Sequence, residues 1–250
     1  MKALITGASS GIGKEIALYL SQIGYDLYVV SRNKSELEKI IERVQTKVEC
    51  LEFDLMKEED CSKLYEQLKD KGIDIVVNNA GFGLFGYFNK TDLDRELEMI
   101  NVNIVSLHIL SKLFLKDMVK RNRGKILNVA SSAGFFAGPY LSTYYATKNY
   151  VLKLTMAISE ELKRQNSKVT VSALCPGPVD TGFNKVAGGH FNTSSLTSKY
   201  VARVAIDNTL KGKLIIVPSL KMKLGVFFSR FLPYKLQLKI LYRSQKGKTK

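Results

Sequence analysis

Short apolar runs alternate with longer segments of helical periodicity along most of this 250-residue chain. The short runs are nearly all apolar, which is typical of strands buried on both faces of a parallel sheet. Strands are predicted over residues 2–6, 26–31, 48–53, 73–77, 125–130, 169–174 and 214–217. Helices are predicted over 11–23, 35–45, 57–69, 93–100, 104–120, 142–163 and 197–210. This order predicts one α/β domain over residues 1–220, a doubly wound parallel sheet with helices on both faces.

Residues 221–250 form a basic extension beyond that domain. The net charge is +15, and the 40 residues from Lys211 to Lys250 hold eleven Lys and Arg and no acidic residue. The rest of the chain has 27 basic and 23 acidic residues, so we expect no nucleic-acid-binding stripe on it. In the extension, Leu224, Phe227, Phe228, Phe231 and Leu232 recur at helical spacing among basic residues. Three interpretations remain open: packing on the same or a partner subunit, weak contact with an anionic membrane surface, or a cap over a lipophilic substrate.

Composition excludes several other classes of protein. No apolar run approaches the roughly 20 residues that cross a bilayer, and the first strand follows directly on Met1, so we expect a cytoplasmic protein without a secretory signal. Cys50, Cys61 and Cys175 lack the spacing of zinc ligands and there are only two histidines. We therefore expect no metal site and three buried thiols.

A glycine-rich turn joins the first strand to the first helix. It reads TGASSGIG over residues 6–13 and contains Gly7, Ser9, Ser10, Gly11, Ile12 and Gly13. Glycines let the backbone turn sharply and approach a pyrophosphate, and the helix that begins there aims its free N–H groups at the anion. The turn predicts a dinucleotide site.

Tyr144 and Lys148 stand four residues apart on a predicted helix, so both project from the same face. A phenol normally titrates near pH 10, and an ammonium one turn away favours its ionised form. We therefore expect Lys148 to lower the pKa of Tyr144, which would exchange a proton with a substrate oxygen. The neighbouring Tyr145 is a weaker candidate because the residue four further on is the uncharged Asn149.

Five motifs in order make the sequence resemble the short-chain dehydrogenase/reductase family: TGASSGIG, NNAG at 78–81, Ser131, the Tyr144–Lys148 pair, and PG at 176–177. The resemblance implies a Rossmann fold and a catalytic tetrad of Asn103, Ser131, Tyr144 and Lys148. Ser131 would polarise the substrate carbonyl, Lys148 would also hold the ribose of the nicotinamide, and Asn103 would hold a water in a proton relay. Ser132 and Asn101 are the rivals of Ser131 and Asn103.

The cofactor contacts follow from the same resemblance. Ser31 and Arg32 stand where an acidic residue would favour NAD, and both can donate to a 2′-phosphate, so the sequence favours NADP(H). Asp54 and Leu55 match the adenine contact, and Asn78 is expected to tie neighbouring strands together. The ribose and nicotinamide would lie against Asn79, Ala80, Gly81, Pro176, Gly177, Val179 and Thr181.

The expected function is NADP(H)-dependent reduction of a hydrophobic carbonyl compound, or oxidation of the corresponding alcohol, by a homodimer or homotetramer. Apolar residues near the site suggest the substrate: Phe82, Phe85, Phe135, Phe136, Tyr140, Leu141, Phe183, Val186 and Phe191. Gly182, Gly188 and Gly189 flank a segment that could act as a lid. The alternatives are a nucleotide-binding sensor or scaffold, or an isomerase without net cofactor turnover.

Overall fold

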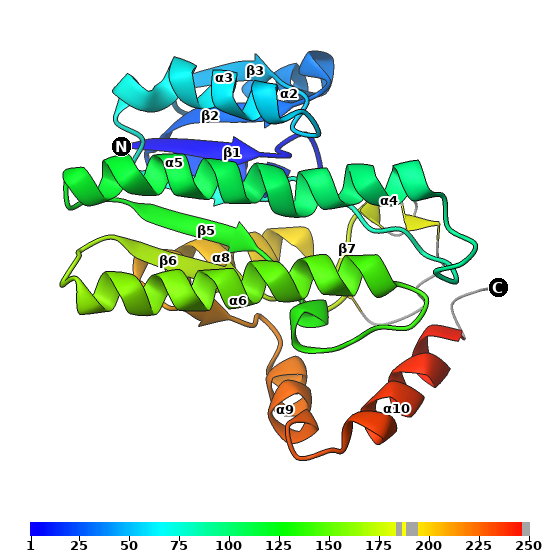
Figure 1. Ribbon diagram of the computed structural model, residues 1–250. Coiled ribbons are helices and arrows are strands. Elements are labelled where there is room, and N and C mark those ends of the chain that lie inside the picture. Colours follow the sequence, from blue (N-terminus) through cyan, green and yellow to red (C-terminus); the bar gives the residue numbers. More distant parts are fainter. Residues whose placement is uncertain (184–186, 189–194, 247–250) are drawn as a thin grey trace.

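The computed structural model describes residues 1–183, 187–188 and 195–246, and contains one seven-stranded sheet in the order β3-β2-β1-β4-β5-β6-β9 (Figure 1). All neighbouring strands in it are parallel. The strands are β1 (Lys2–Thr6), β2 (Asp26–Ser31), β3 (Val48–Glu52), β4 (Ile75–Asn78), β5 (Lys125–Val129), β6 (Thr170–Leu174) and β9 (Ile215–Ile216). The predicted doubly wound parallel sheet is confirmed.

Some details of the strands differ from the prediction. β4 begins two residues later than expected, and β9 has only two residues in the sheet. A second parallel sheet joins β7 (Val179–Asp180) to β8 (Leu196–Thr197) and was not predicted. Strands of two residues are too short to show a periodic pattern.

Helices cover both faces of the large sheet, and alternate residues of each strand contact one layer or the other. In β1, Ala3 and Ile5 belong to the core cluster that includes Ile16 and Leu37, whereas Leu4 faces the cluster that includes Leu64. On the first face lie α1 (Gly11–Gln22), α2 (Lys34–Ile41) and α8 (Ser198–Leu210). On the second face lie α3 (Glu58–Leu68), α4 (Leu93–Ile100), α5 (Ser106–Lys120) and α6 (Ser142–Arg164).

α4 and α5 form one continuous helix, which corrects the prediction of two separate helices. Residues Asn101–Val105 join them as a π-helical turn, a local widening that is frequent at functional sites. By length and composition alone the 28-residue helix Leu93–Lys120 could span a membrane, contrary to the expectation from the apolar runs of the sequence. It instead lies along the sheet (Figure 1), and Leu107, Leu110 and Phe114 are buried.

The chain changes its direction of winding between β1 and β4. From β1 the strand order runs to β2 and β3 on one side, and from β4 it runs to β5, β6 and β9 on the other. Ligands of open α/β sheets bind at such a reversal, outside the carboxyl ends of the strands. The loops that follow β1, β4, β5 and β6 meet there.

Two helices follow β9 and project from the body of the molecule (Figure 1): α9 (Leu220–Ser229) and α10 (Tyr234–Lys246). Ser219 caps α9, since its side chain accepts from the backbone N–H of Met222. Pro233 separates the two helices, as expected. The shorter 3-10 segments of the chain are η1 (Lys69–Lys71) and η3 (Ser132–Phe135).

Candidate active site

A cleft of about 460 Å³ lies at the carboxyl ends of β1 and β4. Its volume suits a small-molecule or cofactor site. Most residues predicted from the sequence line it: Gly7, Ser9, Ser10, Gly11, Ile12, Ser31, Arg32, Asp54, Leu55, Asn79, Ala80, Gly81, Ser131, Tyr144, Lys148, Pro176, Gly177, Val179 and Thr181. Gly13 and Asn103 lie behind this lining, and both support it.

The glycine-rich turn forms a cradle at one end of the cleft. Gly7 has a φ of +62° and Gly11 a φ of +53°, conformations that favour glycine. A Cβ on Gly13 would lie 2.3 Å from the Gly7 carbonyl oxygen and 2.4 Å from Asn79 Nδ2. Asn79 Nδ2 donates to the carbonyl oxygens of Thr6 and Gly7, both at 3.0 Å, and so fixes the turn.

The start of α1 faces this cradle with its backbone donors available. Ser10, the N-cap residue, makes no side-chain hydrogen bond to the helix, and the first turn contains no acidic residue. Free N–H groups and the positive end of the helix dipole together favour an anion such as a pyrophosphate. The donor set and the close backbone approach therefore fit the pyrophosphate of a dinucleotide.

Ser31 and Arg32 end β2 beside the cradle. Ser31 Oγ donates to Ser9 Oγ at 3.3 Å, and the exposed Arg32 guanidinium contacts the Met56 sulfur at 3.7 Å. Asp54, beyond β3, accepts the backbone N–H of Met56 with Oδ1 at 3.2 Å. These groups lie along one wall of the cleft.

Asn78, at the end of β4, joins three elements under the cleft. Its Nδ2 donates to Ser111 Oγ on α5 at 2.9 Å and to Asn128 Oδ1 on β5 at 2.8 Å. All three side chains are buried. Asn78 thus connects neighbouring strands, as expected from the sequence.

Tyr144 and Lys148 lie on the first turns of α6, with exposed fractions of 9% and 5%. Lys148 Nζ donates to the Val129 carbonyl oxygen at 2.9 Å and stands 5.9 Å from the centre of the Tyr144 ring. Ser131, just after β5, accepts the backbone N–H of Ala133 at 3.1 Å. A side-chain hydrogen bond joins Ser131 to Tyr144 and acts to lower the pKa of the phenol.

Burial dominates the ionisation of this pair, contrary to the expectation from the sequence. It raises the pKa of Tyr144 to about 12, against the smaller opposing effect of Ser131. It lowers the pKa of Lys148 to about 8. Both shifts have the same cause, since a low-dielectric environment disfavours the charged form of either group. Lys148 does not offset the pKa shift of Tyr144, since its Nζ bonds to the Val129 carbonyl oxygen and stands 5.9 Å from the centre of the Tyr144 ring.

Asn103 occupies the π-helical turn, and its side chain is almost completely buried. Its Oδ1 accepts the backbone N–H of Phe82 at 3.1 Å, and its Nδ2 donates to the Phe82 carbonyl oxygen and to Thr147 Oγ1, both at 3.0 Å. A Cβ on Gly81 would lie 2.5 Å from Asn103 Oδ1 and 3.5 Å from Lys148 Nζ. Asn103 therefore lies directly behind the cleft wall and close to Lys148.

The loop after β6 closes the cleft from the other side. The Pro176 carbonyl oxygen accepts the backbone N–H of Ser132 at 2.8 Å, which ties this loop to the serine segment. The Thr181 methyl group would lie 3.2 Å from a Cβ on Gly11, so Thr181 sits over the glycine turn. Its hydroxyl accepts the backbone N–H of Phe183 at 3.3 Å.

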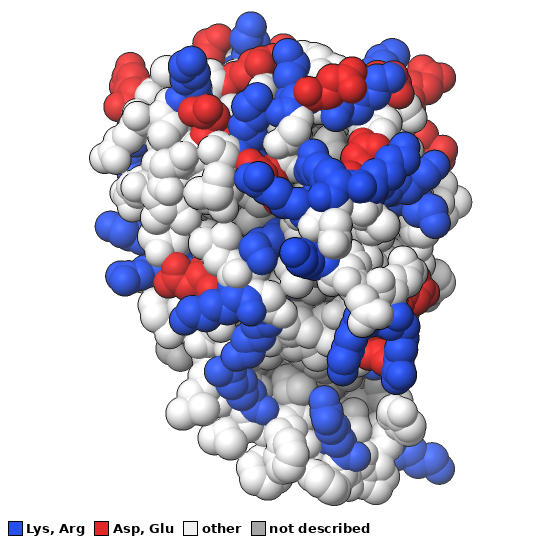
Figure 2. All heavy atoms as spheres, turned by 90° about the vertical axis from the view of Figure 1, so that its left-hand side faces the viewer, with Lys and Arg blue, Asp and Glu red and all other residues white. Residues whose placement is uncertain are grey.

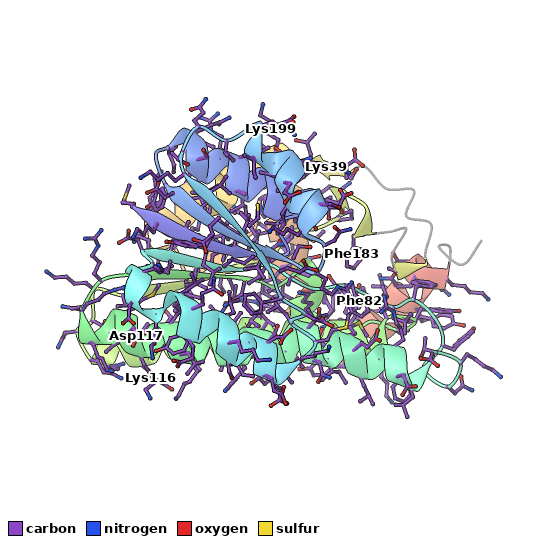
Figure 3. All side chains as sticks on the ribbon, turned by 90° about the horizontal axis from the view of Figure 1, so that it is seen from above. Lys39, Phe82, Lys116, Asp117, Phe183 and Lys199 are labelled. Atoms are coloured by element: carbon purple, nitrogen blue, oxygen red, sulfur yellow. The ribbon has the colours of Figure 1, made fainter. Side chains whose placement is uncertain are left out.

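Only part of the predicted substrate pocket lines the cleft, namely Phe82, Leu141 and Phe183. The Phe183 ring lies 5.3 Å from the Tyr144 ring, and Figure 3 shows Phe82 and Phe183 at the same end of the sheet. Phe85 and Tyr140 stack on each other at 5.6 Å without lining the cleft, and Phe135 and Phe136 also lie outside it. Gly182 lines the cleft and Gly188 has a positive φ, whereas Val186, Gly189 and Phe191 fall outside the described residues.

Three further residues line the cleft: Arg95 and Gln245, which were not predicted, and Tyr145, the weaker candidate beside Tyr144. Gln245, on α10, is 4% exposed and donates through Nε2 to the Tyr145 hydroxyl at 2.8 Å. Its Oε1 has no hydrogen-bond partner among the described residues. The Arg95 guanidinium lies 4.3 Å from the centre of the Phe82 ring, so the lining is less apolar than expected.

A cluster of three tyrosine hydroxyls also connects α10 to the body. Tyr140 donates to Tyr242 at 3.2 Å, and Tyr87 and Tyr140 share a hydrogen bond of 2.8 Å. Tyr242 and Gln245 are three residues apart, a spacing that places them on one face of a helix. That spacing is visible in the sequence, but their partners, about 100 residues away, are not.

Comparison with known proteins decides the family. The short chain dehydrogenase family model matches residues 1–190. The chain belongs to the short-chain dehydrogenase family. A very-long-chain 3-oxoacyl-CoA reductase of Mycosarcoma maydis is 33% identical over 68% of this chain and 51% of that protein. This chain therefore aligns with about half of the length of that relative.

Solved structures of short-chain dehydrogenases share most of this fold. A member from Sphingobium yanoikuyae in complex with NADPH is 28% identical, with a TM-score of 0.82 over 88% of each chain. A member from Burkholderia phymatum in complex with NAD is 22% identical, with a TM-score of 0.83 over 90% of this chain and 91% of that one, and shows the likeness of fold alone. The protein thus has the Rossmann fold of this family of oxidoreductases.

Proposed function

We propose that this protein is an NADP(H)-dependent oxidoreductase that reduces a hydrophobic carbonyl compound, or oxidises the corresponding alcohol, with Tyr144 as general acid and base. One observation carries the proposal. Ser131, Tyr144 and Lys148 line the same cleft as the glycine cradle, and Asn103 supports the wall behind Lys148. A hydride carrier held in the cradle would thus lie beside a group that can move a proton.

The end of β2 supports NADP(H) as the cofactor. Ser31 and Arg32 line the cleft there, at the place where a carboxylate would bind the ribose hydroxyls of NAD. A hydroxyl and a guanidinium can both donate to a 2′-phosphate, which a carboxylate would repel. The NADPH bound by the relative from Sphingobium yanoikuyae agrees with this choice.

Each side chain has a defined part in the proposed reaction. The bound nicotinamide supplies or accepts the hydride at the substrate carbon. During reduction, the Tyr144 hydroxyl donates its proton to the substrate oxygen as negative charge develops there. Ser131 would donate a hydrogen bond to the same oxygen, and Lys148 would hold the ribose hydroxyls of the cofactor. Asn103 positions the loop at Gly81 and would hold a water molecule of a proton relay behind Lys148.

The ionisation of the pair favours the reductive direction at neutral pH. Because burial raises the pKa of Tyr144 to about 12, the phenol carries the proton that reduction requires. Because the pKa of Lys148 is about 8, its ammonium form still predominates at neutral pH. Oxidation of an alcohol would instead require the phenolate, which burial disfavours.

Three apolar side chains of the cleft lining support a hydrophobic substrate: Phe82, Leu141 and Phe183. The name of the relative from Mycosarcoma maydis, a very-long-chain 3-oxoacyl-CoA reductase, is consistent with such a substrate. Gln245 and Arg95 add polar groups to the wall, so the substrate would carry a polar function besides its carbonyl group.

A direct test follows NADPH absorbance with a panel of aldehydes and ketones of increasing chain length. We expect consumption of NADPH, with lower KM values for the longer apolar compounds. A sensor or scaffold would bind NADPH without turnover, and an isomerase would convert its substrate without net NADPH consumption. Either of these outcomes would refute the proposed reaction.

We also propose a cytoplasmic homodimer or homotetramer that pairs through the helix Leu93–Lys120, which contains Asn103, and through α6, which contains Tyr144, as the resemblance to the family implies. Light scattering coupled to gel filtration would test this assembly. A monomer at micromolar concentration would exclude it.

A further inference from the structure

The α9–α10 pair, called the C-terminal hairpin below, exposes large apolar side chains to an unusual extent. Phe228 and Phe231 are 61% and 73% exposed, and Leu220 is 69% exposed. The Phe227 ring contacts the rings of Phe228 and Phe231, with centre-to-centre distances of 5.4 and 5.6 Å. The exposed set continues along the hairpin with Leu224, Leu232, Tyr234, Leu236, Leu238, Ile240 and Tyr242. Contiguous apolar surface of this kind marks an interaction site.

Basic side chains border that apolar surface, and no acidic residue balances them. The chain has no Asp or Glu from Lys211 onward. The exposed basic residues of the hairpin include Lys221, Lys223, Arg230, Lys235, Lys239 and Arg243. Within the described part of the chain, none of these six forms a salt bridge. At the lower end of Figure 2, where the hairpin lies, the surface is mostly uncharged, with basic side chains beside it.

We propose that the C-terminal hairpin docks the protein on an anionic lipid bilayer. Its phenylalanine and leucine side chains would enter the boundary between headgroups and acyl chains, and its lysines and arginines would contact lipid phosphates. Charge complementarity favours this occupant over a second copy of the chain. In a symmetric pair the same basic residues would face each other without any acidic partner, and like charges oppose such an interface.

The position of the C-terminal hairpin links membrane docking to the active site. Gln245 lines the cleft and Tyr242 bonds to Tyr140, so the helix that carries part of the docking surface also forms a wall of the active site. A lipophilic substrate dissolved in the bilayer would reach the cleft along α10. This use rests on the proposed function, whereas the docking itself does not.

Co-sedimentation of the full chain with vesicles tests the docking separately from turnover. We expect binding to phosphatidylcholine vesicles that contain phosphatidylglycerol, weaker binding to phosphatidylcholine alone, and release by added salt. Each basic residue near an anionic surface is worth roughly a fivefold change in affinity. The triple variant Lys221→Gln, Lys223→Gln, Arg230→Gln should therefore bind roughly 100-fold more weakly. The control triple Arg43→Gln, Lys47→Gln, Lys168→Gln removes exposed charges elsewhere and should bind as the parent does.

A second pair of variants tests the apolar half of the surface. The double variant Phe228→Ser, Phe231→Ser should reduce vesicle binding at least tenfold, because two aromatic side chains would no longer be buried in the lipid. Ile41→Ser with Tyr200→Ser, at exposed sites on α2 and α8, should leave it unchanged. Circular dichroism and melting curves would verify that all variants fold.

Three outcomes would overturn the proposal. The first is equal binding to neutral and anionic vesicles, or no binding to either. The second is binding that the lysine and arginine changes weaken but the phenylalanine changes do not, which would indicate a purely electrostatic surface. The third is a lower molar mass of the phenylalanine variant in light scattering, which would show that the hairpin is an interface between copies.

Discussion

Gly13→Ala should disrupt the cradle by steric overlap alone. The added Cβ would lie 2.3 Å from the Gly7 carbonyl oxygen and 2.4 Å from Asn79 Nδ2. Favourable contacts between heavy atoms lie near 3.5–4.0 Å, so the turn would have to open by about 1 Å. Both neighbours are fixed, because Asn79 Nδ2 itself bonds the Thr6 and Gly7 carbonyl oxygens.

Overpacking of this kind costs about 1–3 kcal/mol in the free energy of unfolding. We expect a value of roughly 2 kcal/mol for Gly13→Ala, together with a Kd for NADPH raised about tenfold or more, since the backbone donors would no longer converge on the phosphates. Urea unfolding followed by circular dichroism measures the first effect, and isothermal titration calorimetry measures the second.

Gly225→Ala is the matched control. Gly225 lies inside α9, and a Cβ added there meets no atom within 4 Å. Alanine favours a helix over glycine by about 1 kcal/mol, so this variant should be equally or more stable and should bind NADPH normally. If Gly13→Ala were as stable as the parent and bound NADPH equally well, the steric account of the cradle would be refuted.

Three further predictions concern the cofactor, the pH profile and the cleft wall. Arg32→Glu should raise the KM for NADPH about 10- to 100-fold and leave the KM for NADH nearly unchanged. The reason is that a charge-assisted hydrogen bond to the 2′-phosphate is replaced by repulsion of that phosphate. Equal effects on both cofactors would contradict the assignment of NADP(H). For carbonyl reduction, kcat/KM should be level up to about pH 8 and fall above it, since Lys148 loses its proton there while Tyr144, with a pKa of about 12, keeps its own. A profile that rises from pH 8 to 10 would be inconsistent with these ionisations. Gln245→Ala should raise the KM for the carbonyl substrate more than it lowers kcat, with NADPH binding unaffected; an unchanged substrate KM would exclude a role for this amide.

The fold could be predicted from the sequence because its strands are buried on both faces. Continuous apolar runs such as those of β1 and β2 gave the observed bounds, whereas β7 and β9, with two residues each, carry little periodic signal. The junction at Asn101–Val105 was predicted as a break between two helices. A π-helical turn preserves the helix axis while it redirects side chains, and no propensity rule distinguishes it from a break.

The candidate site was predictable where residues lie close in sequence or in a known motif. The glycine turn and the Tyr144–Lys148 pair depend on local spacing, and both line the cleft as expected. Gln245 depends instead on how α10 folds back on α6, which is a matter of tertiary packing between segments 100 residues apart. The pKa of Tyr144 was predicted to shift downwards, whereas it shifts upwards, because the sequence shows the nearby charge but not the depth of burial.

The most direct test of the proposed mechanism is turnover by Tyr144→Phe. This change removes only the hydroxyl of a side chain that is already buried, so the fold and NADPH binding should persist. Loss of general acid catalysis of this kind is worth about 10²–10⁴ in rate. We predict that kcat for NADPH-linked carbonyl reduction falls by at least about 100-fold, while the Kd for NADPH stays within about twofold of the parent value. Undiminished turnover would show that another group supplies the proton and would contradict the account.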